Sequence, residues 1–100
     1  MPTLIIKPQA QADLDSIFDY IAQDSVQHAE HFLRLFYEKF LLLQQMPETG
    51  TTRPDLALGI RAFPFRRYVI FYQITETGLD IVRILHGARD IPNLFGEGTG

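Results

Sequence analysis

The first residues of the chain predict a strand followed by a helix. Residues 3–7 form a short β-branched run that is typical of a strand, and Pro8 suits the first turn of a helix. Apolar residues then recur with the spacing of one helix face, at Leu14, Ile17, Phe18 and Ile21. This spacing predicts an amphipathic helix of about four turns.

A second and broader apolar stripe predicts another helix. Asp24 or Ser25 can cap its N-terminus, because either side chain can accept a hydrogen bond from a free backbone amide. The stripe ends at Met46 and Pro47, so we expect two helices joined by a tight turn. Its residues are Ala29, Phe32, Leu33, Phe36, Phe40 and Leu43.

The second half of the chain alternates like strands. Residues 47–58 have no period and predict a loop, whereas residues 60–65, 68–74 and 79–86 predict an antiparallel meander. Pro64 favours an edge position or a bulge for the first of these strands, because proline has no amide to donate. We therefore expect an α+β fold: an N-terminal strand, a two-helix hairpin and a three-stranded antiparallel meander, with the helices on one face of the sheet.

Both faces of the middle strand are largely apolar, and two helices can cover only one of them. The other face either binds another chain or is covered by the C-terminal residues. We expect a single domain over residues 1–90 and a partly disordered tail over residues 91–100, in which Leu94 and Phe95 can dock. One face carries Tyr68, Ile70, Tyr72 and Ile74, and the other carries Val69, Phe71 and Gln73.

The length and composition are those of one small domain. The 100 residues are 46% hydrophobic and 21% charged, which excludes disorder of the whole chain. The chain has no cysteine, which excludes disulfides and thiolate sites and favours the cytoplasm. No apolar run reaches the roughly 18 residues of a membrane span, so we expect no membrane partner.

The charge is unevenly distributed. Residues 1–50 contain seven acidic and three basic side chains, whereas residues 51–100 contain six basic and five acidic ones. Seven of the nine basic residues are arginines, which suit carboxylates and phosphates. The second half therefore predicts an acidic partner or a polyanion, or else arginines that only protect sheet edges.

Several kinds of chemistry lack a sequence signal. His28 and His31 lie about one helical turn apart, but no third ligand has matching spacing, so we expect no metal. We find no nucleophile elbow and no glycine-rich phosphate loop, and we expect no cofactor. The acidic residues of the first helix, Asp13, Asp15 and Asp19, predict a solvated face.

One group of basic and aromatic residues remains on the predicted meander. Arginine can bind phosphate, tyrosine can stack on a base and histidine can donate a proton, so these residue types would suit a small ribonuclease. Strand alternation places Arg83 and His86 on opposite faces unless the strand end twists or bulges, which favours a structural role for His86. The group comprises Arg61, Arg66, Arg67, Arg83, His86 and Arg89, with Tyr68 and Tyr72 interleaved.

Four strings in the sequence resemble a known toxin family. They are AQADLDSIFDYIAQDS (10–25), LLQQMPETG (42–50), GIRAFPFRRYVIFYQI (59–74) and DIVRILHGARD (80–90). With the order of the predicted elements, they make the chain similar to ParE-like toxins of the ParE/RelE toxin–antitoxin superfamily, the plasmid stabilisation protein family. No single string is specific, but together they span nearly the whole chain.

The resemblance implies a function. ParE-like members poison DNA gyrase and block replication, whereas RelE-like members are ribosome-dependent mRNA endonucleases with a set of basic catalytic residues. This chain departs from the lysine-rich RelE pattern, because its only lysines, Lys7 and Lys39, lie outside the meander. The resemblance implies a non-enzymatic gyrase inhibitor; the alternatives are an mRNA endonuclease that uses Arg61, Arg83 and His86, and a non-toxic binding module.

The resemblance also implies partners and binding residues. A ParD-like antitoxin with an acidic C-terminal half would fold onto the toxin, which would form a hetero-oligomer with it or a homodimer. We expect no sequence-specific contact with nucleic acid. The antitoxin would contact Arg61, Phe63, Phe65, Arg66, Arg67, Tyr72 and Arg83. Gyrase would contact Arg83, His86, Arg89 and an exposed pair near the chain end, Leu94 and Phe95.

Overall fold

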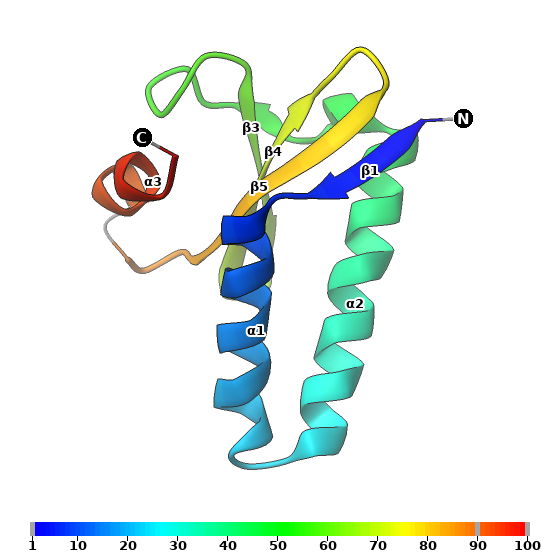
Figure 1. Cartoon of the computed structure of the whole chain (residues 1–100), viewed down its shortest axis with the longest axis vertical. Coiled ribbons are helices and arrows are strands. Elements are labelled where there is room, and N and C mark those ends of the chain that lie inside the picture. Colours follow the sequence, from blue (N-terminus) through cyan, green and yellow to red (C-terminus); the bar gives the residue numbers. More distant parts are fainter. Residues whose placement is uncertain (1, 90, 100) are drawn as a thin grey trace.

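A computed structural model describes residues 2–89 and 91–99 as an α+β fold (Figure 1). Over these residues the strands form a single sheet in the order β1-β5-β4-β3-β2, with β1 parallel to β5 and the other pairs antiparallel. The predicted architecture is confirmed. The elements are β1 (Thr3–Ile6), α1 (Pro8–Ala22), α2 (Val26–Gln45), the 3₁₀ turn η1 (Pro47–Thr49), β2 (Thr51–Thr52), β3 (Ile60–Phe65), β4 (Tyr68–Ile74), β5 (Gly78–His86) and α3 (Ile91–Thr99).

Local signals fix the ends of the two long helices. α1 begins at Pro8, and Ser25 is the N-cap of α2, where its Oγ accepts a hydrogen bond from the His28 amide at 3.2 Å. α2 ends at Gln45, directly before Met46 and Pro47. In the part of the chain that the structure describes, no helix is both long and apolar enough to cross a membrane.

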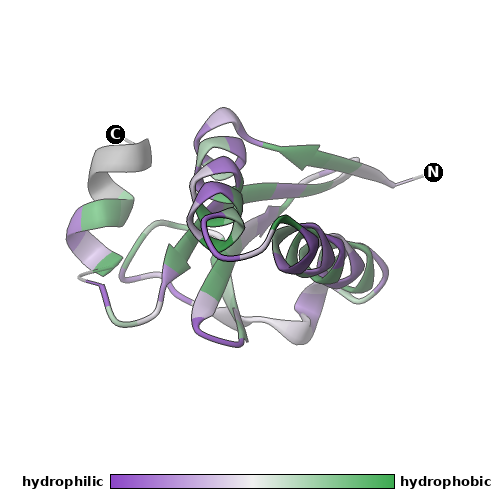
Figure 2. Ribbon diagram, turned by 90° about the horizontal axis from the view of Figure 1, so that it is seen from below, coloured by the Kyte–Doolittle hydropathy of each residue, from purple (hydrophilic) through white to green (hydrophobic). Residues whose placement is uncertain are grey.

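The main core lies between the two-helix hairpin and one face of the sheet (Figure 2). The period of α1 and α2 places their apolar stripes toward the strands, and alternation along β4 places Ile70 and Tyr72 toward the helices. The predicted covering of one sheet face by both helices is confirmed. The buried residues of this core are Ala10, Leu14, Phe36, Phe40, Leu43, Ile70, Tyr72, Leu79, Ile81 and Ile84.

The chain's own C-terminal residues cover part of the opposite face. Where the sequence predicts a partly disordered tail, the structure describes the helix α3. Residue 90, at which the predicted domain boundary falls, and residue 100 lie outside the described residues. Phe95 is 1% exposed, and its ring packs edge-to-face on Phe71 with the centroids 5.3 Å apart. This second core comprises Ile60, Ala62, Phe71, Leu85 and Phe95, with Leu56, Ala57, Val69, Val82, Ile91 and Leu94 packed against it.

Residues 47–58 have more regular structure than the predicted loop. They include η1 and β2, and β2 pairs with Arg61 and Ala62 of β3. The sequence misses β2 because a two-residue strand has no alternation to detect. Pro64 lies in the part of β3 that β2 does not reach, which agrees with its predicted edge position.

Candidate functional site

An open groove lies beside β5, between α1 and the start of α3. Its volume is about 620 Å³. Four of the five residues expected to contact gyrase line it, and we therefore take this β5 groove as the candidate site. The lining residues are Asp13, Ser16, Ile17 and Tyr20 of α1, Tyr68 of β4, Arg83, Ile84, Leu85 and His86 of β5, Ala88 and Arg89 of the turn that follows, and Leu94 of α3.

The groove exists because β5 is longer than β1. β1 pairs with β5 only as far as Ile6 and Ile81, so the rest of β5 has α1 beside it instead of a strand. The lining residues of α1 are spaced by three, four and seven positions, which places them on one side of the helix. The last residue of this row, Tyr20, is a large exposed aromatic side chain that the sequence pattern did not single out as a site residue.

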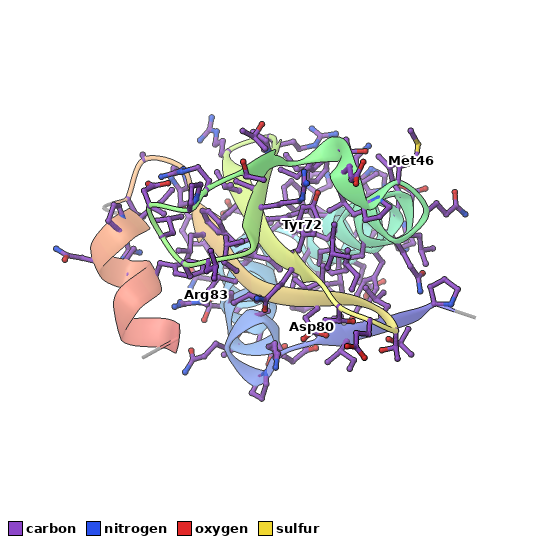
Figure 3. The ribbon with its side chains drawn as sticks, turned by 90° about the horizontal axis from the view of Figure 1, so that it is seen from above. Met46, Tyr72, Asp80 and Arg83 are labelled. Atoms are coloured by element: carbon purple, nitrogen blue, oxygen red, sulfur yellow. The ribbon has the colours of Figure 1, made fainter. Side chains whose placement is uncertain are left out.

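Arg83, which is labelled in Figure 3, lines the groove and donates hydrogen bonds from three guanidinium nitrogens to two partners. Its Nε and Nη2 donate to the two carboxylate oxygens of Asp13 at 2.9 and 3.0 Å, and its Nη1 donates to the Leu94 carbonyl at 3.0 Å. Asp13 also accepts the Ile84 amide at 2.9 Å, beyond the end of β1. Arg83 thus joins α1, β5 and α3, and the predicted solvated face is wrong for Asp13.

Arg83 and His86 both line the groove although they lie on opposite faces of β5. The pairing of β4 with β5 shifts between Phe71 and Tyr72 and leaves Val82 without an opposite residue, but this β-bulge precedes Arg83. From Arg83 to His86 the register is regular, so the expected alternation of these two residues holds. They reach the same groove because it lies along the edge of β5, where side chains of both faces are accessible.

His86 and Tyr68 form an aromatic side of the groove. Their rings meet edge-to-face with centroids 5.4 Å apart. The Nδ1 atom of His86 accepts the Ala88 amide at 3.1 Å, so the neutral imidazole carries its proton on Nε2. Burial raises the pKa of Tyr68, nearby Tyr20 raises it further and Arg67 lowers it.

Arg66 and Arg67 form the turn between β3 and β4, which we call the basic turn. The Gly87 amide donates to the Arg67 carbonyl at 2.8 Å and ties this turn to the one that follows β5. Arg66 has a φ of 58°, in the left-handed region that arginine seldom adopts. Its guanidinium lies 5.5 Å from the Phe65 ring centroid, and Lys39 Nζ lies 5.5 Å from the same centroid. The turn therefore presents ordered positive charge.

Arg61 and Tyr72 hold the segment that follows α2. Tyr72 is 0% exposed; its hydroxyl donates to the Pro47 carbonyl at 2.6 Å and accepts the Gly50 amide at 2.7 Å. Burial raises the pKa of this hydroxyl. Arg61 Nη1 donates to the Gly50 carbonyl at 2.7 Å. The structure contradicts the expected antitoxin contact of Tyr72, because a side chain without exposed surface cannot touch a partner.

The other residues that the sequence analysis assigned to binding or catalysis lie in different parts of the structure. Phe63 and Phe65 are half-buried against the main core near the basic turn. Phe95 is buried, so the expectation of an exposed pair at the chain end is wrong for this residue. The three residues of the nuclease alternative do not come together, since Arg61 binds Gly50 while Arg83 binds Asp13. Among the described residues, no group of three acidic, histidine or cysteine side chains could hold a metal ion.

Comparisons with known proteins agree on one family. Residues 4–91 match the model described as "ParE toxin of type II toxin-antitoxin system, parDE". The chain is 30% identical over 88 residues to Toxin ParE3 of Caulobacter vibrioides, which covers 87% of this chain and 88% of that protein. It is similar, with a TM-score of 0.72 and 26% identity, to a structure titled "Chromosomal ParDE TA system from P. aeruginosa", over 86% of this chain and 96% of that one.

Proposed function

The chain belongs to the ParE toxin family of type II toxin–antitoxin systems, and from this premise we propose that it inhibits DNA gyrase in the cytoplasm and so blocks replication. A ParD-like antitoxin neutralises it. The relative of known structure comes from a ParDE system, which supports an antitoxin partner. The β5 groove is the surface that meets the target.

The structural roles of two arginines support binding and not RNA cleavage. Cleavage of a phosphodiester needs an acid, a base and a positively charged clamp that converge on one phosphate. Arg83 is committed to Asp13 and the Leu94 carbonyl, and Arg61 is committed to Gly50. Arg83 and His86 both line the groove, but because Arg83 is committed to Asp13, His86 has no phosphate clamp from this set beside it. The proposal of a non-enzymatic inhibitor rests on this incomplete set of catalytic residues.

The test is a gyrase supercoiling and cleavage assay, run beside a ribosome-dependent translation reaction whose mRNA is mapped for cuts. We expect stabilised double-strand breaks in the DNA and intact mRNA. Arg89→Glu, at the groove, should weaken the gyrase effect, whereas Arg34→Glu, exposed on α2, makes the same charge change away from it. Cut mRNA with unaffected gyrase would establish the nuclease alternative.

The antitoxin contact is best placed at the basic turn. Arg66 and Arg67 are exposed, and Phe63 and Phe65 add partly exposed apolar surface beside them. Strained backbone conformations cluster where function requires them, and the left-handed Arg66 is such a residue. An acidic segment of the antitoxin fits this combination of charge and aromatic surface.

Charge reversal of the basic turn tests this contact. The double variant Arg66→Glu/Arg67→Glu should weaken antitoxin binding about tenfold or more, because it opposes the acidic segment. Titration calorimetry with the cognate antitoxin measures the change, which should shrink at high salt. Arg66→Gly is the companion variant. It removes the guanidinium and should therefore weaken binding. It also relieves the left-handed strain, so it should not lower the free energy of unfolding. Unchanged affinity in both variants would remove the basic turn from the interface.

A further inference from the structure

The β5 groove combines accessible rings with positive charge. Tyr20 is 71% exposed, and the edge-to-face pair of Tyr68 and His86 lines the strand side of the same groove. Tyr20 also lies near enough to Tyr68 to influence its ionisation. Arg89 is exposed at the groove. Aromatic rings beside arginine are typical of surfaces that stack unpaired bases and contact phosphates.

The groove presents little negative charge to a polyanion. Among the described lining residues Asp13 is the single acidic side chain, and Arg83 neutralises it through two hydrogen bonds. The groove then has a net positive charge, which comes from Arg89 in its lining and from Arg67 beside Tyr68. A phosphate backbone is therefore attracted to this surface.

The groove is the right size for an unpaired strand and too small for a duplex. A volume of about 620 Å³ is that of a small-ligand site, too small for a double helix. We propose that the β5 groove binds single-stranded DNA without sequence preference, with a base stacked on Tyr20 and phosphates beside Arg89 and His86. The inference rests on the proposed function, because a toxin bound to a gyrase complex meets cleaved DNA, and it names DNA and not gyrase protein as the ligand of this groove.

Binding is measured by fluorescence anisotropy with a short labelled oligothymidylate. A duplex of the same length and a labelled polyglutamate peptide are compared under the same low-salt conditions. We expect the single strand to bind at least about tenfold more tightly than either, because only it offers both unpaired bases and phosphates. A peptide that binds more tightly than the oligonucleotide, in a manner sensitive to Tyr20, would overturn the inference and make the groove a peptide site.

Variants of Tyr20 separate stacking from apolar contact. Tyr20→Leu keeps apolar surface but loses the ring, and should weaken oligonucleotide binding about tenfold, which corresponds to about 1.4 kcal/mol. Tyr20→Phe keeps the ring and should bind like the unaltered protein. Tyr37→Leu is the matched control, because Tyr37 is a surface tyrosine of α2, 37% exposed and outside the groove. Circular dichroism confirms that each variant is folded.

A charge variant tests the phosphate contact. Arg89→Gln should reduce affinity and lower the slope of log affinity against log salt by about 0.7, the value for one phosphate contact on a single strand. Arg34→Gln removes the same charge from α2, outside the groove, and should leave that slope unchanged. Equal slopes for both variants would contradict phosphate contact at Arg89.

The same variants in the gyrase assay distinguish this inference from the proposed function. If the protein poisons gyrase but Tyr20→Leu poisons it equally well, the groove is not the DNA contact and the inference fails while the function stands. If the protein binds the oligonucleotide in a Tyr20-dependent way and leaves gyrase unaffected, the proposed function fails while the groove's ligand class stands. Loss of both activities in Tyr20→Leu supports both.

Discussion

Asp13→Ala is expected to lower the free energy of unfolding by about 3–5 kcal/mol, because it leaves the Arg83 guanidinium buried without its carboxylate. The Ile84 amide loses its acceptor in the same variant. A domain of this size has roughly 5–15 kcal/mol of stability in total. Urea denaturation should show a large fall in the transition midpoint, and a melting experiment should show a fall of more than about 12 °C.

Two variants make this result specific to the buried pair. Replacing both partners in Asp13→Leu/Arg83→Met removes the buried charge together with its carboxylate partner and should recover most of the stability that the single variant loses. Lys7→Ala removes a more exposed partner, whose Nζ lies 3.6 Å from Asp80, and should cost less than about 1 kcal/mol. Equal losses for Asp13→Ala and Lys7→Ala would contradict the role assigned to the Arg83–Asp13 pair.

This pair also limits how toxicity data on Arg83 can be interpreted. Arg83 connects β5 to α1 and, through the Leu94 carbonyl, to α3. Its removal is therefore expected to disturb three elements that form the β5 groove, even if the side chain never contacts the target. Tyr20 and Arg89 are better probes of target binding, because both are exposed and can be changed without opening the core.

Local sequence patterns were sufficient to predict most of the fold. The stripes of α1 and α2 and the alternation of β3, β4 and β5 are properties of neighbouring residues, so their elements and approximate ends follow directly. For the same reason the N-cap of α2 was limited to Asp24 or Ser25, and the structure shows that it is Ser25. α3 did not follow, because its sequence IPNLFGEGT has weak helix propensity and its place depends on the burial of Phe95 against Phe71.

The candidate site was only partly predictable, because its geometry depends on long-range pairing. His86, Arg89 and Leu94 were expected at a target surface, and they do line one groove. The roles of Arg83 and Tyr72 were not foreseen, since Asp13 is 70 positions from Arg83 and Pro47 is 25 positions from Tyr72. Residue type alone does not reveal which arginine or tyrosine will be used internally.

Gly78→Ala is expected to cost about 2–3 kcal/mol of unfolding free energy, because an added methyl group would collide with the backbone of β1. A Cβ at this position would lie within 3.0 Å of the Thr3 backbone carbon, an approach that real Cβ atoms essentially never make. Backbone atoms cannot move aside as a flexible side chain can. The strands must therefore separate where Thr3 pairs with Gly78 at the start of the parallel ladder.

Hydrogen exchange locates this effect and Gly87→Ala provides its control. In Gly78→Ala the Thr3 amide, which donates to the Thr77 carbonyl at 2.8 Å, should exchange markedly faster, while amides of the α2 interior change only as global stability falls. At Gly87 an added Cβ would lie 3.5 Å from the Arg67 carbonyl oxygen, an ordinary contact, so Gly87→Ala should be nearly neutral. If Gly78→Ala were as stable as Gly87→Ala, β1 would have to pair with β5 more loosely than its register indicates. Because β1 leads directly into α1, such a loose pairing would also leave Asp13 and Tyr20 less firmly placed at the groove.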